Sequence, residues 1–391
     1  MAAALRPALE PPRSLFADAR RRARGIRTAA QNFRENRRRA ASGREDLLPL
    51  YFIWTTHRTC NFLCEYCDDH QGHKYPELST EGQLDTAQAK RLLEIMRTRA
   101  SSIYFAGGEP TLRKDLPELT RYASDLDYYP IIVNTNASAL HRQLELPAWR
   151  TWLADTDQVI VSLDALDLDV LREMWVYERP RDVLRNVLVL RELAAEMRVK
   201  LTVNAVIQPG RIAHAKDVLD FACDLGIGFA PVPVNVGPKV ADGLRDDPAY
   251  AAFAALILER KRQGHRITGS RRMNERLLGS APLACRNTLK PHVDHDGTLF
   301  WPCKASVNVA PLRLRVLDYA SVDALWEAGC ALRDPTAFHG QGPEQCGANC
   351  NWAQNYTTDA YAHGLEHPLS LLAEVVDFLR PRSSDGRQAS R

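Results

Sequence analysis

The chain has 391 residues, of which 45% are hydrophobic and 25% are charged, a composition that argues against wholesale disorder. A chain of this length can bury a sizeable core, so we expect two domains, or one large domain with an appendage. It contains no run of roughly 18 to 20 apolar residues that would span a bilayer, and its first residues lack the apolar stretch of a secretory signal. We therefore expect a cytoplasmic protein. The formal net charge of +3 is nearly balanced overall.

The basic residues are concentrated near the start of the chain, where residues 13–44 hold eleven arginines and only two acidic residues. Apolar residues recur there at steps of three and four, which predicts an amphipathic helix that ends near Ser42 and Gly43. The apolar stripe consists of Leu15, Ala19, Ala23, Ile26, Ala30 and Phe33. Such a helix could dock on an anionic membrane or a nucleic acid, but a helix packed on its own enzyme gives the same pattern. We favour packing on the enzyme.

From residue 51 the sequence alternates short β-rich runs with longer helical segments. The β-rich runs span residues 51–56, 102–106, 130–135, 158–163, 199–207 and 227–234, and the helical segments include 82–99, 115–126, 181–197 and 212–225. Each run is nearly continuously apolar, so we expect a parallel sheet with both faces buried and helices outside. The pattern predicts an α/β fold in the form of a partial (β/α)6 barrel similar to a TIM barrel.

The alternation stops after residue 235. A further helix is expected at about 247–264, and Asp296-Gly297 between β-rich flanks predicts a hairpin. We divide the chain into a basic segment, a barrel, a helical connection, a small C-terminal α+β domain and a disordered tail. The ranges are 1–46, 47–240, 241–274, 275–382 and 383–391.

Three cysteines, Cys60, Cys64 and Cys67, lie on the loop directly after the first expected strand. In a βα barrel the loops at the carboxyl ends of the strands form the reacting face. In a reducing compartment, cysteines are more often metal ligands or catalytic groups than disulfide partners. Three thiolates leave one iron of a cubane cluster without a protein ligand, and this open position can bind a cofactor. The alternative is a zinc site, whose cysteines usually come in CxxC pairs with four ligands.

This loop resembles that of the radical S-adenosylmethionine (SAM) superfamily, because it matches the CxxxCxxC motif at every cysteine and has Tyr66 before the last one. Gly107-Gly108-Glu109, at the end of the second expected strand, looks like the family's GGE motif, which binds the amino end of the methionine part of SAM. Glycines permit close approach there.

Two further groups of residues extend the resemblance. Ser162 and Asp164 are similar to the SxD element that contacts the SAM ribose, although Ala165 stands where many relatives have glycine. Asn134, Asn136 and Asn204 lie in or after strands at positions where the family often places polar groups facing SAM or substrate. By resemblance, the three cysteines and SAM coordinate a [4Fe-4S] cluster, and an electron from this cluster splits SAM into methionine and a 5'-deoxyadenosyl radical. A reductase or flavodoxin-type protein would supply the electron.

Four later cysteines form a second set, Cys285, Cys303, Cys346 and Cys350. With the hairpin between the first two, they resemble the twitch domain, a shortened SPASM extension that holds an auxiliary [4Fe-4S] cluster. Gly297 to Cys303 is one residue longer than the usual GxxxxC spacing, and a four-thiolate zinc site is the alternative. Cys223 and Cys330 fall in helical patterns and are interpreted as core thiols, with Cys330 as a reserve ligand.

The leading hypothesis is a radical SAM enzyme that oxidises or rearranges an organic metabolite, such as a natural-product or carbohydrate-like precursor. The alternatives are maturation of a ribosomal peptide, and modification of a lipid or isoprenoid with docking through the basic helix. A nucleic-acid partner is not expected, because no RNA-binding module accompanies the basic segment. No catalytic residue is assigned. His292 and His295, near the hairpin, are interpreted as solvated.

Overall fold

The structure is a computed structural model that describes residues 9–67, 69, 72–283, 286–304, 312–338 and 350–372. Its residues form two compact units. The first unit comprises Met1–Val161, Asp169–Leu201 and Asn287–Phe338, and the second comprises Ser162–Leu168, Thr202–Arg286 and His339–Arg391. This division differs from the expected domains, because residues 287–338 belong with the unit that holds the first strands. The expected tail lies outside the described residues.

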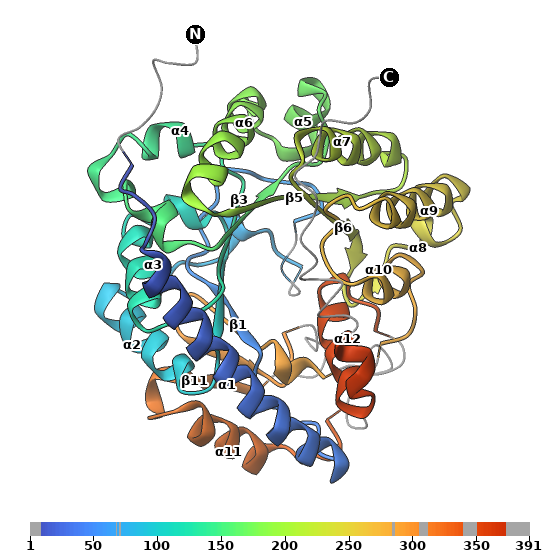
Figure 1. The fold of residues 1–391 in the computed structure, drawn as a ribbon. Helices are drawn as coiled ribbons and strands as arrows, with labels where there is room; N and C mark the ends of the chain where they lie inside the picture. Colours follow the sequence, from blue (N-terminus) through green and yellow to red (C-terminus); the bar gives the residue numbers. More distant parts are fainter. Residues whose placement is uncertain are drawn as a thin grey trace. The chain divides into compact units, whose positions relative to one another are not determined.

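The first unit is built on four parallel strands, with helices between them and after the last one (Figure 1). The strands are β1 (Tyr51–Thr55), β2 (Ser102–Ala106), β3 (Ile131–Thr135) and β4 (Gln158–Ser162). The helices are α2 (Thr86–Arg97), α3 (Leu116–Asp125), α4 (Leu140–Gln143), α5 (Leu168–Trp175) and α6 (Pro180–Met197). One face of the sheet is fully buried, as at Trp54, Phe105 and Val133, whereas side chains on the other face, such as Tyr104 and Asn134, are half-buried. The half-buried face is therefore the one open to a bound molecule.

Three more strands extend this sheet beyond β1. β9 (His292–Val293) is parallel to β1, and it is followed by β10 (Thr298–Trp301) and β11 (Leu312–Arg315), each antiparallel to the strand before it. The hairpin expected at Asp296-Gly297 is confirmed, because the amide of Asp294 donates to the carbonyl of Thr298 at 2.8 Å. α11 (Val322–Leu332) covers these strands, and its Trp326 ring lies 4.9 Å from that of Trp301. This hairpin region thus joins the barrel sheet.

The second unit contains two parallel strands, β5 (Lys200–Ile207) and β6 (Gly228–Pro233), with α7 (Ile212–Leu225) between them. The other elements of this unit are β7 (Asn235–Val236), β8 (Lys239–Val240), α8 (Asp242–Arg245), α9 (Pro248–Arg262), α10 (Arg271–Leu278) and α12 (Tyr356–Glu366). The residues after β4 belong here, since the amide of Leu163 donates to the carbonyl of Asn204 at 2.9 Å. All six expected strands are confirmed to within a residue or two.

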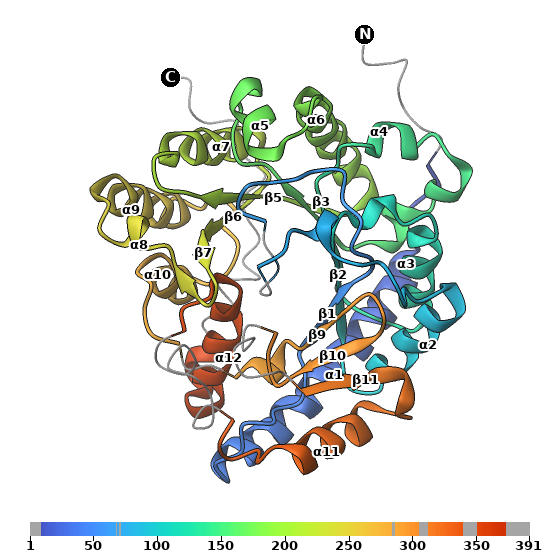
Figure 2. The ribbon, with the colours of Figure 1, turned by 180° about the vertical axis from the view of Figure 1, so that it is seen from behind.

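The basic segment forms α1 (Leu15–Ala41), as expected, and α1 packs on the first unit. Figures 1 and 2 show α1 and the loop after β1 on opposite sides of this unit. The buried face of α1 is not the apolar stripe. It carries Arg21, Gly25, Asn32 and Asn36. Asn32 donates to the carbonyls of Pro49 and Arg99, which precede β1 and β2. α1 therefore lies where the strands begin.

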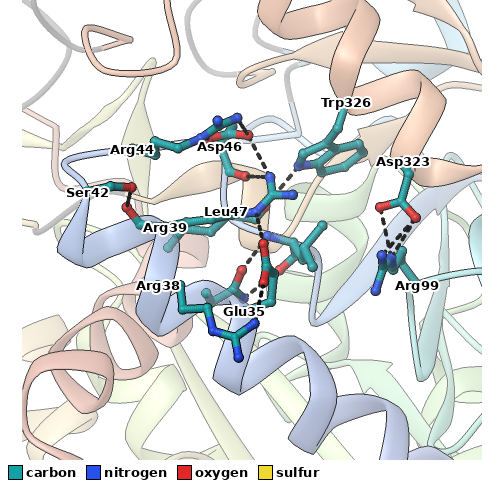
Figure 3. A network of polar contacts seen from close by, with 12 residues as sticks. Glu35, Arg38, Arg39, Ser42, Arg44, Asp46, Leu47, Arg99, Asp323 and Trp326 are labelled. Carbon is teal, nitrogen blue, oxygen red and sulfur yellow. Dashed lines mark hydrogen bonds and ion pairs between the residues drawn. The ribbon is translucent and has the colours of Figure 1, made fainter.

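Figure 3 shows how the end of α1 is fixed. Asp46 is fully buried, and Arg39 donates to both its carboxylate, at 2.6 Å, and its carbonyl, at 2.8 Å. Arg44 donates to the same carboxylate at 2.6 and 2.8 Å. The indole of Trp326 on α11 donates to the carbonyl of Leu47 at 3.0 Å. In the ranges that the structure describes, no helix combines the length and the apolar character needed to cross a membrane.

Candidate functional site

The three cysteines of the first motif lie on the loop that follows β1, and all three are partly buried. The loop is held from one side by the end of α5, because Leu63 and Glu65 donate their amides to the carbonyls of Trp175 and Met174. The Phe62 ring packs between those of Trp175 and Tyr177, at centroid distances of 5.1 and 4.4 Å. Phe62, between the first two cysteines, thus anchors the loop, while the cysteines remain partly accessible.

The GGE segment is in direct contact with the start of this loop. Gly108 and Glu109 donate their amides to the carbonyls of His57 and Thr59, at 2.9 and 2.8 Å. A Cβ on Gly108 would lie 2.2 Å from the carbonyl oxygen of Thr59, and one on Gly107 would lie 2.5 Å from that of His57. Gly107 also has a φ of +137°, a backbone conformation that other residues rarely adopt. Both glycines are therefore required by the contact between the two motifs, whatever they do for SAM.

Glu109 is 1% exposed and stands at the centre of a network of hydrogen bonds. Its carboxylate accepts from the hydroxyl of Thr111 at 2.6 Å, the hydroxyl of Thr135 at 2.5 Å and the amides of Thr111 and Asn136 at 2.9 and 2.6 Å. Burial raises the pKa of Glu109, and these four donors act in the opposite direction. The carboxylate joins the end of β2 to the end of β3, so its expected contact with SAM stays a prediction.

Asn136 continues this network to the cysteine loop. Its amide nitrogen donates to the side-chain oxygen of Asn61 at 3.0 Å and lies 4.0 Å from the sulfur of Cys60. The amide of Phe62 donates to the same sulfur at 3.4 Å. Burial raises the pKa of the Cys60 thiol to about 12. Thiolate formation at Cys60 would thus be favoured by a bound metal centre, whose positive charge offsets the cost of burial.

Two other candidate residues have buried oxygens with no protein partner. The side-chain oxygen of Asn134, on the half-buried face of β3, makes no hydrogen bond within the described ranges, and neither does that of Asn204 on β5. A buried polar atom without a partner is costly, so such atoms fit positions that a bound polar molecule satisfies. Asp164 differs, because its carboxylate accepts from the amide of Val206 at 2.8 Å. Ser162 is the last residue of β4, and Tyr66 is half-buried on the cysteine loop.

A group of buried charges that sequence reasoning missed lies beside the cysteine loop. The ammonium of Lys304 is 2.9 Å from the carboxylate of Asp69, and both side chains are almost fully buried. The Lys304 ammonium also lies 5.5 Å from the centre of the Tyr75 ring. Lys304 follows the candidate ligand Cys303, and Asp69 comes shortly after Cys67. The ion pair therefore links the segments that carry the two cysteine sets, and no local motif signals it.

A second ion pair beside the hairpin joins Arg58 to Asp294. Nε2 of His295 donates to the carbonyl of Glu81 at 2.9 Å, and its Nδ1 lies 3.1 Å from the carboxylate of Asp294. Within the described part of the chain, Asp294, His295 and Asp296 are the one group whose ligand atoms lie close enough for a metal ion. Arg58 already neutralises Asp294 there. His292 and His295 are buried, so their interpretation as solvated residues was wrong.

Two of the four cysteines of the second set, Cys303 and Cys350, lie within the described residues. Cys303 follows β10 and is half-buried, and Cys350 is buried in the second unit beside Asn351, whose side chain accepts from the amide of Val240. Cys285 and Cys346 lie outside the described residues. Cys330 is on α11 next to Asp46 and Arg44, and Cys223 is on α7. Their positions fit the interpretation as structural thiols.

Sequence comparisons give the same family for the barrel. Residues 54–222 match the model of the radical SAM superfamily. The chain is 31% identical to a PqqA peptide cyclase of Bradyrhizobium diazoefficiens over 44% of its length, and 31% identical to a GTP 3',8-cyclase of Streptomyces coelicolor over 42%. These matches cover 42% and 47% of the relatives themselves. The chain thus spans less than half of the length of each of these two relatives.

Solved structures show the same fold. SuiB of Streptococcus suis bound to S-adenosylmethionine has a TM-score of 0.56 and 17% identity, covering 73% of this chain and 68% of SuiB. anSMEcpe with bound AdoMet has a TM-score of 0.52 and 16% identity, covering 83% of this chain and 98% of that protein. Together with the parallel strands, these likenesses confirm the expected partial barrel.

The family match implies two bound groups, a [4Fe-4S] cluster and SAM. The residues fit both, since three partly accessible cysteines share one braced loop and partnerless amide oxygens are available on the strands. The match also covers the cysteine loop, the GGE segment and the SxD element at once. Over residues 54–222, the chain contains a radical SAM domain.

Proposed function

We propose that this protein is a radical SAM enzyme that cleaves SAM reductively and functionalises a C–H bond of an organic substrate. The observation that carries the proposal is the pair of backbone hydrogen bonds from Gly108 and Glu109 to the start of the cysteine loop. These bonds hold the segment that we propose to bind SAM against the loop that we propose to hold the cluster, which supports chemistry between the two groups. The family match over both motifs supports the same conclusion.

The chain's own residues would bind and orient the reacting groups. Cys60, Cys64 and Cys67 would hold the cluster and leave one iron open for SAM. When bound, these groups supply a 5'-deoxyadenosyl radical that takes a hydrogen atom from the substrate. Asn134 and Asn204, whose side-chain oxygens are buried without partners, would accept hydrogen bonds from SAM or substrate. Such fixed contacts hold the target carbon near the radical and keep other hydrogen donors away.

For the substrate we propose a small organic metabolite, such as a natural-product or carbohydrate-like precursor, which would be oxidised or rearranged. Similarity to GTP 3',8-cyclases, which are named for a nucleotide substrate, supports a small molecule. A peptide substrate is the second candidate, because PqqA peptide cyclases are similar over the same part of the chain. Products formed from a synthetic peptide or from a sugar nucleotide would distinguish these classes.

We further propose that Cys285, Cys303, Cys346 and Cys350 hold an auxiliary [4Fe-4S] cluster in a twitch-like region. The position of Cys303 directly after a β-hairpin supports this assignment. If all four thiolates bind, the auxiliary cluster has no open iron and is suited to electron transfer. An external reductase or flavodoxin-type protein would supply the first electron, and a reducing cytoplasm would keep the cysteines from forming disulfides.

Anaerobic turnover tests the proposed function. Reconstituted protein with SAM and dithionite should form 5'-deoxyadenosine and methionine, and Cys60→Ala should form neither. Cys223→Ala is the matched control, since this half-buried cysteine lies on α7 outside both sets, and it should retain activity. Equal product from the wild type and Cys60→Ala would overturn the proposal.

A further inference from the structure

The outward face of α1 combines exposed apolar side chains with unpaired arginines. Leu15, Phe16 and Ile26 are 72%, 81% and 65% exposed, which is unusual for large apolar residues on a helix that is packed against a protein. Arg20, Arg27 and Arg34 are also exposed, and their spacing of seven residues places them in one row along the helix. We define these six residues, with Arg37, as the outer face of α1.

In an ordinary amphipathic helix the apolar face is buried, whereas α1 buries polar side chains and exposes its apolar residues. Hydrogen bonds from the buried side chains account for this arrangement. Asn36 is fully buried, donates to the carbonyl of Leu48 at 3.0 Å and accepts from its amide at 2.6 Å. Arg21 donates to the carbonyl of Tyr128 at 3.0 Å and to both carboxylate oxygens of Asp157, at 2.8 and 2.6 Å. Because polar side chains attach the helix to the sheet, its apolar stripe remains on the surface.

The charges on the outer face have no acidic partner. Within the described ranges, Arg20, Arg27, Arg34 and Arg37 make no ion pair, whereas the two acids of α1, Asp18 and Glu35, are already engaged with other arginines of the helix. A surface that complements this face must therefore supply many negative charges next to an apolar layer. The boundary between anionic headgroups and acyl chains has both properties.

Other occupants of the face fit less well. A nucleic acid offers negative charge but no apolar surface for Leu15, Phe16 and Ile26. A second copy docked face to face would oppose two rows of arginines. An acidic electron donor would sit where the strands begin, whereas the cysteine loop lies at the other end of the same strands.

From the outer face of α1 we infer that this protein docks peripherally on an anionic lipid surface. The helix would lie along the headgroup layer, with Leu15, Phe16 and Ile26 inserted and the arginine row on the lipid phosphates. α1 would form the contact through side chains that take no part in the fold. Since the cysteine loop is at the opposite end of the first unit, docking holds the enzyme at a membrane without delivering a lipid substrate to the radical.

Co-sedimentation with vesicles tests this inference on the full-length, cluster-loaded protein. We expect binding to phosphatidylcholine vesicles that contain phosphatidylglycerol and no binding to phosphatidylcholine alone. Arg20→Gln/Arg27→Gln/Arg34→Gln should bind roughly 100-fold more weakly. The matched control is Arg181→Gln/Arg185→Gln/Arg198→Gln, which removes three exposed arginines on or next to α6 and should bind like the wild type.

A second variant, Phe16→Ser/Ile26→Ser, separates lipid insertion from simple charge attraction. It should bind the anionic vesicles at least about 10-fold more weakly, while its thermal unfolding and 5'-deoxyadenosine formation match the wild type. Unchanged vesicle binding by this variant would overturn the inference, because the face would then attract any polyanion. Absence of binding by the wild type at low salt would overturn it as well, and neither result bears on the radical chemistry.

Discussion

Buried polar side chains hold segments of the chain in place at both ends of the first unit, but the two ends present different surfaces. At the carboxyl ends of the strands, buried Glu109 and Asn136 tie β2, β3 and the cysteine loop together. At the amino ends, buried Asn32 and Asn36 tie α1 to the chain before β1 and β2. In both places buried polar side chains help to fix the position of a segment. The two ends differ in the groups that stay accessible. The carboxyl ends of the strands carry partly accessible thiols, and the amino ends carry the basic and apolar outer face of α1.

The largest effect is expected from Gly108→Ala, which breaks the contact between motifs at the carboxyl end. The new methyl group would lie 2.2 Å from the carbonyl of Thr59, so the cysteine loop or the GGE segment must move. Displacement of reacting groups by about 1 Å can cost on the order of 100-fold in rate. We expect a loss of iron and at least this decrease in 5'-deoxyadenosine formation.

Gly264→Ala is the control for this prediction. Its Cβ would meet nothing within 4 Å, although its φ of +92° makes the substitution mildly unfavourable. A loss of about 1 kcal/mol in stability with full iron content is expected. Equal iron content in both variants would show that the close contact at Gly108 is not needed for the cluster.

Lys304→Met tests the buried charges beside the cysteine loop. Removing the ammonium leaves Asp69 charged and buried, which should lower the free energy of unfolding by about 3 kcal/mol. Lys90→Met, which removes a partly exposed pair with Glu118, should cost less than about 1 kcal/mol. Chemical denaturation under anaerobic conditions measures both. Recovery of stability in Lys304→Met/Asp69→Asn would identify the unpaired carboxylate as the cause, and equal losses in the two single variants would contradict this account.

Asn36→Leu applies the same test at the amino end. Leu48 would lose the partners of both its amide and its carbonyl in a buried site, so we expect a loss of about 2 kcal/mol. Iron content and 5'-deoxyadenosine formation should not change, because the helix is remote from the cysteine loop. Gln31→Leu, at an exposed position of the same helix, should be nearly neutral. A loss of iron in Asn36→Leu would show that the two ends are coupled.

The smallest effect concerns pH. Burial lowers the pKa of His57, whose Nε2 donates to the carbonyl of Glu109 at 2.6 Å. His57 therefore binds a proton less readily in the folded protein than in the unfolded chain. As the pH falls below 6.5, the unfolded chain is protonated first, so the free energy of unfolding decreases. We expect this pH dependence in the free energy of unfolding of the wild type and a flatter profile for His57→Gln. Identical profiles would show that His57 does not titrate in this window.

Periodicity and motifs in the sequence predicted the strands and the first cysteine site, because both signals are local. The burial of α1 could not be predicted in the same way. Its stripe of apolar residues indicated which face should be inside, but Asn32 and Asn36 meet backbone groups that only the folded sheet brings to them. Lys304 and Asp69 are distant in sequence, so their pairing left no local signal either. Glu109 was recognised by its motif, yet two of its four internal hydrogen bonds come from Thr135 and Asn136 at the end of β3.

Electron paramagnetic resonance of the reduced protein tests the central claim most directly, because it reports on the cluster that SAM touches. Addition of SAM should change the signal of one [4Fe-4S]+ cluster in the wild type. In Cys60→Ala this SAM-responsive signal should be absent, while any signal from the later cysteines persists. A SAM-dependent change that survives in Cys60→Ala would contradict the assignment of the radical site to the loop after β1.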